Sequence, residues 1–562
     1  MAIIGIDLGT TNSACGIWAN GELSLIKNRL GDTLTPSVVG LDDTGEVIVG
    51  RRAKERLISH SDLTVAVFKR LMGSNHKVKL GKKEFSAIEL SALILKALKE
   101  DAEAHLNATV DAAVISVPAY FNDNQRHATK LAGELAGLEV NRLINEPTAA
   151  AVAYGLHEKQ EGTFLVLDMG GGTFDVSILE FFDGIMEVHA SAGDNFLGGE
   201  DFVTAMVNDF LQQQEVKSST LNKAQLNSLY MQMETIKRRV DVLDGTPFSF
   251  NLGKHTVEWT PTADWFQKIS TPLLLRAKIP IERAMRDAKT RADDIDDIIL
   301  VGGATRMKLF RNTIGRMFGR FPSANIDPDT VVAQGAAVQA GLVAKDAALD
   351  DVVLTDVCPY TLGTAIHNSN TKEAGYFFPI IERNAVVPIS IVKRLYTAED
   401  NQTSVNVRVY QGENRTVDKN IFLGDLDVKV PKKKAGEEAI DVRYSYDMNG
   451  LLEIDVEVVS TGEKVNKVIH NAPGSLSEEE IGKCREKLAQ LKFHPRDQEE
   501  NKALVAKGER LYESFIGEQR EWIAQILKAF DAVLERQNPI EIQQERKKLS
   551  QILDDLDNED WL

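Results

Sequence analysis

The stretch IDLGTTNS (Ile6–Ser13) decides the fold, because it recurs in altered form as LDMGGGTFD (Leu167–Asp175). Each copy follows an apolar run, IIGI or FLVL, and precedes another one, CGIW or VSIL. Two apolar runs joined by a turn of small residues predict a β-hairpin. Both copies also place an aspartate, Asp7 or Asp168, two residues before the first glycine. The chain therefore contains the same predicted hairpin twice.

The residue types in both turns suit a phosphate group. Glycine lets backbone N–H groups approach an oxyanion closely, and threonine hydroxyls add donors. An aspartate at the strand end cannot bind phosphate directly, but it can hold a hydrated metal ion against one. Either turn alone could be an ordinary glycine-rich hairpin; the pair predicts two related lobes that grip one polyphosphate. The sequence contains no GxxxxGK[ST] and no GxGxxG before a helix, which excludes a P-loop and a dinucleotide fold.

The composition is that of a large globular protein with an acidic surface. The chain has 562 residues, of which 26% are charged and 43% hydrophobic, enough for several domains. A net charge of −18 argues against nucleic acid as a partner. Cys15, Cys358 and Cys484 have no metal-ligand spacing, which fits a reducing compartment. With no signal peptide and no membrane-spanning apolar run apparent, we expect a cytoplasmic protein without a membrane partner.

The chain divides by pattern into four parts. Residues 1–349 alternate short β-rich runs with helical periodicity, as in an α/β domain. Residues 350–357 contain the apolar run VVL between acids, and residues 358–474 read as short alternating strands of a β-sandwich. Residues 475–562 are helical; they open with a capping box at Ser477 and Glu480. An apolar stripe there predicts the core of a helical bundle: Trp522, Ile526, Phe530 and Val533.

Within the α/β part, corresponding elements also occur twice. AAVISV (residues 112–117) ends at Pro118 before a helix predicted from Asp123, and DIILVGG (residues 297–303) leads to a second helical stretch. NEPTAAAVAYGL (residues 145–156) and GAAVQA (residues 335–340) are rich in small residues that let helices pack closely. These pairs extend the duplication beyond the hairpins.

Eight motifs along the chain resemble those of the heat-shock protein 70, or DnaK-type, chaperones. They are IDLGTTNS, FKRLMG (68–73), VISVPAYFNDNQR (114–126), RLINEPTAAA (142–151), LDMGGGTFDVS, GDNFLGGEDF (193–202), LVGGATR (300–306) and YTAEDNQ (396–402). The short helical tail and the wordings ASAGDNFLGGEDF and DVCPYTLG are similar to the bacterial HscC-type subgroup.

This resemblance implies a multidomain fold: an actin-like (ribonuclease-H-like) duplicated ATPase over residues 1–349 and a linker over 350–357. A β-sandwich that binds peptide over 358–474 and a short helical lid over 475–562 follow. It also implies an ATP-dependent chaperone that hydrolyses ATP to ADP and phosphate. Implied cofactors are ATP or ADP, Mg²⁺ and K⁺. Implied partners are unfolded or extended polypeptide, a J-domain cochaperone and a nucleotide exchange factor.

Carried over by motif, the resemblance assigns roles in the ATPase. Lys69 and Thr173 would act at the γ-phosphate, and Asp7, Glu146, Asp194 and Asp201 would organise the hydrated Mg²⁺ and K⁺ as catalytic and metal-binding acids. The phosphates and adenosine would be held by Gly9, Thr10, Thr11, Asn12, Gly170, Gly171, Gly172, Gly198, Gly199, Glu234, Lys237, Arg238, Gly302, Gly303, Arg306 and Asp329. Asp241 and Ala304 stand where the family has serines, so we expect altered contacts to the nucleoside.

The resemblance also assigns signalling and peptide-binding residues, each with a plainer alternative. Pro118, Arg126 and Glu146 match the switch between nucleotide and peptide domains; alternatively they are a strand-ending proline and a surface ion pair. Arg142 matches a residue that receives the J-domain. Val353 and Leu354 would dock on the ATPase, or else form the first edge strand of the sandwich. The peptide pocket would be lined by Leu395, Ala398, Val405 and Val407, which could instead be ordinary core.

Two further positions depart from the family pattern, and rival functions stay open. Thr364 replaces an aliphatic pocket residue, and Thr355 weakens an otherwise apolar linker. The rival functions are an actin-like or sugar-kinase-like phosphotransferase and a nucleotide-gated scaffold without turnover. Peptide-stimulated ATP hydrolysis would distinguish the chaperone from both.

Overall fold

The computed structural model describes most of the chain, and the following statements concern those residues. They are residues 2–158, 161–182, 185–240, 247–252, 255–323, 326–349, 353–367, 374–468, 482–484, 496–515, 517–535 and 539–559. The predicted capping box at residues 477 and 480 lies outside them, as does residue 241.

The first lobe contains the first predicted hairpin, made by β1 (Ala2–Asp7) and β2 (Asn12–Ala19). The sheet has the order β11-β10-β1-β2-β3, and β1 runs parallel to β10 and antiparallel to β2. The helices α2 and α3 both start with capping boxes and pack with this sheet into one core. The bounds are β3 (Glu22–Ile26), β10 (Val110–Val117), β11 (Glu139–Asn145), α2 (Ala87–Leu106) and α3 (Asp123–Leu135).

The second lobe repeats this topology around the second hairpin. β12 (Gly162–Met169) pairs antiparallel with β13 (Phe174–Phe182) and parallel with β17 (Asp297–Val301). β14 (Ile185–Asp194) continues the sheet beyond β13. The predicted duplication is therefore confirmed at the level of strands and their directions.

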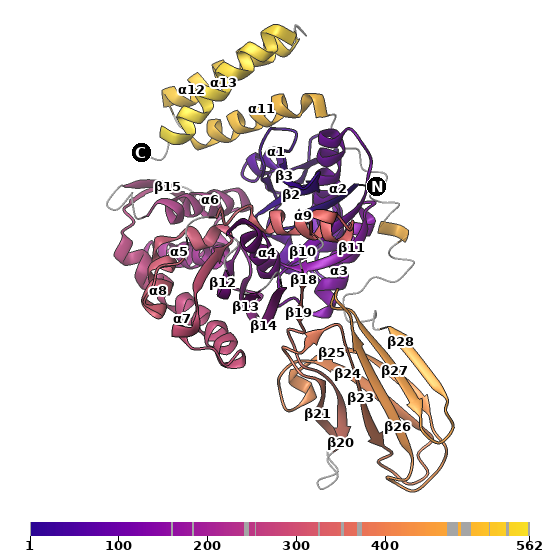
Figure 1. The fold of residues 1–562 in the computed structure, drawn as a ribbon. Coiled ribbons are helices and arrows are strands. Elements are labelled where there is room, and N and C mark those ends of the chain that lie inside the picture. The colour runs from indigo at the N-terminus through magenta and orange to yellow at the C-terminus, as the bar shows by residue number, and fades with distance from the viewer. Residues whose placement is uncertain are drawn as a thin grey trace.

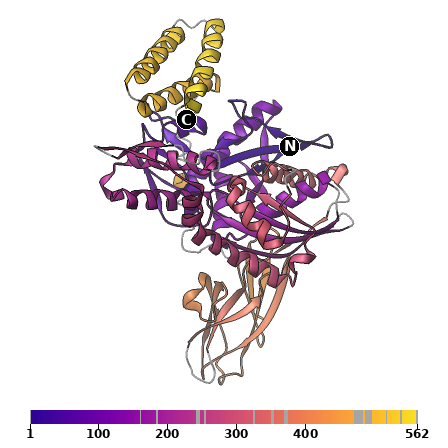
Figure 2. The same cartoon turned by 90° about the vertical axis from the view of Figure 1, so that its left-hand side faces the viewer.

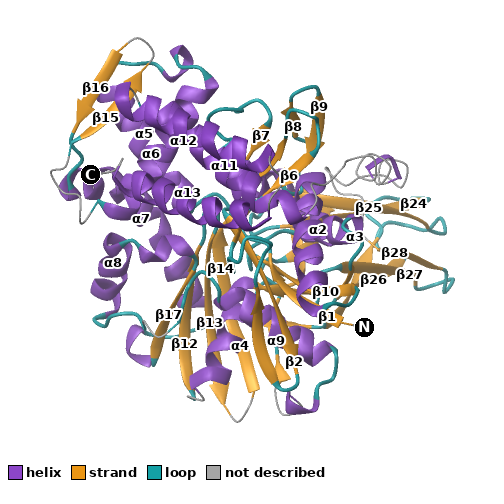
Figure 3. Ribbon diagram, turned by 90° about the horizontal axis from the view of Figure 1, so that it is seen from above, coloured by secondary structure: helices purple, strands orange, loops and turns teal. Residues whose placement is uncertain are grey.

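Two helices rich in small residues, α4 (Glu146–Glu158) and α9 (Val331–Val343), lie side by side between the sheets (Figure 3). A Cβ added at Gly335 would lie 1.8 Å from the carbonyl oxygen of Ala149, and one at Gly5 would lie 2.0 Å from the nitrogen of Ala337. The lobes can approach this closely because these positions have no side chain. The predicted close packing is thus observed.

Smaller elements surround the two lobes. Around the first lobe they are β4 (Thr35–Pro36), β5 (Val39–Leu41), β6 (Val47–Val49), α1 (Arg51–Glu55), β7 (Thr64–Val65), the 3₁₀ turn η1 (Phe68–Leu71), β8 (Lys77–Leu80) and β9 (Lys83–Ser86). Around the second they are α5 (Gly199–Gln213), α6 (Lys223–Arg239), β15 (Phe248–Leu252), β16 (His255–Trp259), α7 (Ala263–Asp287) and α8 (Lys308–Phe318).

The third part is a pair of four-stranded antiparallel sheets around one apolar core, which confirms the predicted strands. The orders are β21-β20-β24-β25 and β23-β26-β27-β28, and β19 and β22 form a separate short pair. The bounds are β19 (Asp356–Val357), β20 (Leu362–His367), β21 (Ala374–Ile381), β22 (Val386–Val387), β23 (Ile389–Tyr396), β24 (Ser404–Gln411), β25 (Ile421–Lys429), β26 (Ala439–Tyr446), β27 (Leu452–Val458) and β28 (Lys464–Val468).

The C-terminal helices α11 (Arg496–Ser514), α12 (Gly517–Glu535) and α13 (Pro539–Glu559) form a helical cluster. Phe530 and Val533 are buried as predicted, but Trp522 is 43% exposed. The prediction for Trp522 was wrong: at this turn of α12 the residue on the core face with Phe530 is Ile523, which is fully buried. None of the helices in the described parts of the chain is long and apolar enough to cross a membrane.

Figures 1 and 2 show that the two-sheet part and the helices α11–α13 lie at opposite ends of the two lobes. The helices contact the first lobe, where the Arg510 guanidinium of α11 pairs with Glu55 of α1. At the other end, Arg383 of the two-sheet part donates to Asp287 of α7 over 2.7 and 3.0 Å. The lobes thus carry one appendage on each end.

Candidate functional site

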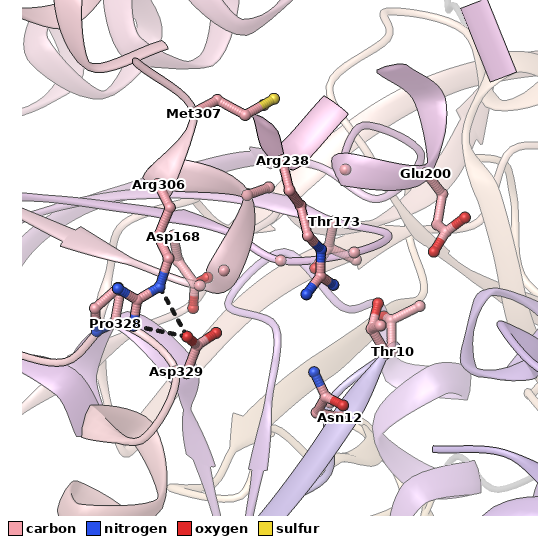
Figure 4. A pocket seen from close by; sticks show the side chains of 18 of the residues that line it. Thr10, Asn12, Asp168, Thr173, Glu200, Arg238, Arg306, Met307, Pro328 and Asp329 are labelled. Carbon is pink, nitrogen blue, oxygen red and sulfur yellow. Dashed lines mark hydrogen bonds and ion pairs between the residues drawn. The ribbon is translucent and has the colours of Figure 1, made fainter. Parts of the chain in front are cut away.

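A cavity of about 340 Å³ lies between the two hairpin turns (Figure 4). Both lobes contribute: Thr10 and Asn12 come from the first hairpin, and Thr173 from the second. Eighteen predicted site residues line it: Asp7, Gly9, Thr10, Thr11, Asn12, Lys69, Glu146, Gly170, Gly171, Thr173, Gly199, Glu234, Lys237, Arg238, Gly302, Gly303, Arg306 and Asp329.

Two predicted glycines, Gly172 and Gly198, do not line the cavity but lie behind its wall. A Cβ on Gly198 would lie 2.6 Å from the backbone of Gly171, and one on Gly172 would lie 2.8 Å from the Arg70 Nε. The Gly199 N–H also donates to the Gly170 carbonyl over 2.9 Å. These glycines therefore allow α5 to hold the second turn in place.

Lys69 is a buried, paired cation and not a solvated charge. It sits in η1, is 4% exposed, and its Nζ lies 2.8 Å from Glu146 Oε1 at the start of α4. Its ammonium also lies 5.5 Å from the ring centre of Phe121. A buried lysine held this way presents a fixed positive charge to whatever fills the cavity.

Three aspartates accompany this pair: Asp168 and Asp175 are buried, and Asp7 is half-buried. Burial, followed by the charge of Glu146, raises the pKa of Asp7 to about 7, and the Ser116 hydroxyl donates to its Oδ1 over 2.8 Å. The same two causes raise the pKa of Asp175 to about 8 and that of Asp168 well above its ordinary value. Asp168 and Asp175 face each other across the second hairpin. Four carboxyl groups around one lysine leave a deficit of positive charge.

Asp194 and Asp201, which are expected to organise the cations, do not line the cavity, and each pairs with an arginine; their role at the cations stays a prediction. Asp194 accepts from Arg276 of α7 over 2.5 and 2.6 Å. Asp201 pairs with Arg70 and accepts from the Gly198 N–H over 2.8 Å. The acids at the corresponding place are Asp168, on the cavity wall, and Asp175 behind it.

The sequence already singles out Asp168 as the strand-end aspartate of the second hairpin, and Asp175 is the other acid of the same motif, LDMGGGTFD. Asp194 and Asp201 lie inside a different motif, GDNFLGGEDF (193–202).

At the far end of the cavity, α6 and the segment after β17 provide polar side chains. Glu234 of α6 binds Lys237 over 2.5 Å and Arg238 over 2.7 Å. Arg306 donates to Asp329 over 2.8 Å, the pair drawn dashed in Figure 4. The prediction missed several wall residues that carry little motif signal: Leu34, Glu200, Phe266, Met307, Lys308, Pro328 and Val332. Ala304, the departure noted above, also lies on this wall.

Of the three proposed switch residues, Arg126 belongs to a buried hydrogen-bond path and not to a surface ion pair, while Glu146 pairs with Lys69. Pro118 directly follows β10. Arg126 is 3% exposed and donates to Asn145 Oδ1 over 2.6 Å and to the Ala119 carbonyl over 3.0 Å. The Asn145 amide in turn donates to Asp356 over 2.8 Å. The path thus joins the first lobe to the segment before the sandwich.

Arg142 lies close to the same segment. Burial lowers the pKa of its guanidinium, and the charge of Asp356 acts in the opposite direction. Its buried Nε makes no hydrogen bond within the described structure.

The linker residues Val353 and Leu354 form a short strand, β18. It pairs parallel with Ile185 and Met186 of β14, and Leu354 is 9% exposed. The alternative that these two residues are the first edge strand of the sandwich is therefore wrong, because their partner lies in the second lobe.

The four predicted pocket residues of the sandwich do not share one environment. Val407 is 2% exposed and belongs to the core, as the alternative proposed. Leu395 and Val405 are half-buried against that core, and Ala398 is exposed. Thr364 is also buried, and its hydroxyl donates to the Arg408 carbonyl over 2.8 Å.

Comparisons with known proteins agree with this geometry. The family model described as "Hsp70 protein" matches residues 3–80 and 74–561. The "Chaperone protein DnaK" of Thermosipho melanesiensis is 41% identical over 525 residues, covering 91% of this chain and 87% of that protein. The protein of the same name from Thermotoga neapolitana is 40% identical, covering 85% and 82%. The chain therefore belongs to the Hsp70 family and is an ATP-dependent chaperone of the DnaK type.

Proposed function

We propose that the cavity binds ATP across the two lobes and hydrolyses it, and that hydrolysis controls peptide binding by the sandwich. The observation that carries this proposal is the pairing of two phosphate-suited turns around one buried lysine and four carboxyl groups, of which three are buried and that of Asp7 is half-buried. Lys69 stabilises the charge that develops on the terminal phosphate, and Thr173 contacts that phosphate. Glu146 fixes the lysine through its 2.8 Å ion pair.

The acids of the site fit a cation held through water. The Oδ2 of Asp175 is buried without a hydrogen-bond partner, and burial has raised the pKa of the aspartates around it. Among the described residues no three acids, histidines or cysteines are close enough to hold a metal directly. Magnesium, when bound, would neutralise the phosphate charge. We assign its hydration shell, and that of potassium, to Asp7, Glu146, Asp194 and Asp201, and we add Asp168 and Asp175 because they lie on and behind the cavity wall.

We assign the parts of the chain as follows: an actin-like ATPase over residues 1–349, a linker over 350–357, a peptide-binding sandwich over 358–474 and a short lid over 475–562. The separate sheets and the C-terminal helices support this division. We further propose that Arg142 receives a J-domain cochaperone, that an exchange factor assists nucleotide release, and that the chain belongs to the HscC-type subgroup. The cytoplasmic location stays a prediction.

The deciding experiment is single-turnover ATP hydrolysis by the purified chain, with and without an extended apolar peptide. We expect the peptide to raise the rate severalfold. A rate that peptide does not change would contradict the chaperone cycle, and phosphate transfer to a sugar would instead support the phosphotransferase.

A further inference from the structure

Tyr120 lies between the acids of the ATP site and the docked sandwich, and its backbone contacts both. Its N–H donates to Asp175 Oδ1 over 2.9 Å. Its carbonyl accepts from the Tyr360 hydroxyl over 2.7 Å and from the Asn195 amide over 2.8 Å. Its own hydroxyl accepts from Arg283 over 2.7 Å. The two peptide groups that flank Tyr120 therefore link the ATP site to the sandwich.

On the ATPase side, Tyr120 has no freedom to move without disturbing the site. Asp175 is fully buried and faces Asp168, which lines the cavity. A Cβ on Gly193 of β14 would lie 2.6 Å from the Cβ of Tyr120, so this side chain already rests on the backbone of the sheet. A shift of Tyr120 must therefore change its hydrogen bond to Asp175.

On the other side, Tyr360 is attached firmly to the sandwich. The next residue, Thr361, donates from its N–H and its hydroxyl to Glu413 over 2.9 and 3.1 Å. Glu413 in turn pairs with Arg383 over 2.5 Å. The rings of Tyr360 and Tyr120 also stack, with centres 4.2 Å apart. Undocking of the sandwich must carry Tyr360 away from Tyr120.

We propose that the Tyr360 hydroxyl restrains ATP hydrolysis while the sandwich is docked, by holding the Tyr120 backbone and, through it, Asp175. This inference rests on the proposed function. It describes a contact separate from β18, because no residue of the chain Tyr360–Tyr120–Asp175 belongs to the linker strand. If peptide stimulates hydrolysis by releasing the docked sandwich, loss of this hydroxyl should imitate part of that release.

The test compares Tyr360→Phe, which keeps the ring stack, with Tyr360→Leu, which removes both contacts. In Tyr360→Phe we expect the basal single-turnover rate to rise severalfold toward the peptide-stimulated rate, while KM for ATP and the ATP-induced release rate of peptide stay within twofold. Tyr376→Phe, on the same sandwich but beside Arg415, should behave as the unmodified chain.

A Tyr360→Phe variant with unchanged basal rate and full stimulation would overturn the proposal. So would a variant whose peptide release slows in parallel, since that would mean general loss of docking. Failure of the proposed function looks different: the unmodified chain itself would then not respond to peptide.

Discussion

The two hairpins have the same topology but different residues opposite their first aspartate. Across the first hairpin, Asp7 faces Ala14; across the second, Asp168 faces Asp175. The first lobe instead supplies the lysine, Lys69. The duplicated fold thus provides two similar grips for phosphate, while the charged groups are divided unequally: the cation comes from one lobe and the additional acid from the other.

The difference extends to the edges of the two sheets. The second sheet receives β18 beside β14, whereas the first ends at β3 in the described structure. The adenosine end is also built from the second lobe, through α6 and the segment after β17. The proposed signals from the sandwich would therefore reach the two lobes by different contacts, and variants can separate their contributions.

The largest effect is expected at the cation of the first lobe. Lys69→Ala should lower single-turnover hydrolysis by orders of magnitude and leave ATP binding nearly intact, because removal of one stabiliser of the transition state costs roughly 3 kcal/mol or more. Lys99→Ala, which removes a lysine on α2 that donates to the Gly137 carbonyl, serves as the control. Hydrolysis within twofold of the unmodified chain would remove Lys69 from catalysis.

The acids of the second lobe should give the next largest effect. Asp168→Asn should weaken magnesium-dependent nucleotide binding by about 10- to 100-fold, the range for loss of a group that orients a metal's surroundings. Asp194→Asn is the matched comparison, because Asp194 pairs with Arg276 outside the cavity. A magnesium titration monitored by nucleotide fluorescence measures both. Equal losses of magnesium-dependent binding in the two variants would support Asp194 as an acid of the cation site.

The linker strand should affect coupling more than catalysis. Leu354→Asp should abolish stimulation by peptide and leave basal turnover unchanged, because a buried leucine contributes about 1.5–3 kcal/mol to docking on β14. Thr355→Leu should tighten coupling slightly. Normal stimulation of Leu354→Asp would show that the strand is only a tether and that the signal crosses the sandwich contacts alone.

The smallest effect concerns pH. The raised pKa values of Asp7 and Asp175, about 7 and 8, mean that the folded state binds protons that the unfolded chain releases. Their contribution to stability is present below about pH 4 and is lost as the pH rises through 7 and 8. Without magnesium, the melting temperature should fall by a few degrees between pH 6 and 8 more in the unmodified chain than in Asp175→Asn. An identical slope in both would mean that Asp175 does not titrate there.

The local pattern of the sequence predicted much of this molecule correctly. The two hairpins, the helix beginning at Asp123 and the strands of the sandwich depend on apolar periodicity and turn residues, which act over a few residues. Most of the residues predicted for the ATP site also lie in motifs, and 18 of the predicted residues line the cavity. For the four residues assigned to the peptide pocket the sequence is less decisive, because strand spacing alone cannot tell a pocket wall from a core.

By itself, the sequence determined that this chain has two lobes with phosphate-suited turns, since glycines, threonines and flanking apolar runs specify a hairpin locally. Only the tertiary structure decided which carboxyl groups surround the cavity. Asp194 and Asp201 pair with arginines on other elements, whereas Asp168 and Asp175 are buried and have no arginine partner in the described structure. It also decided that Leu354 pairs with the second lobe and that Ile523, not Trp522, faces the helical core. These outcomes depend on contacts between residues far apart in the chain, which local periodicity does not encode.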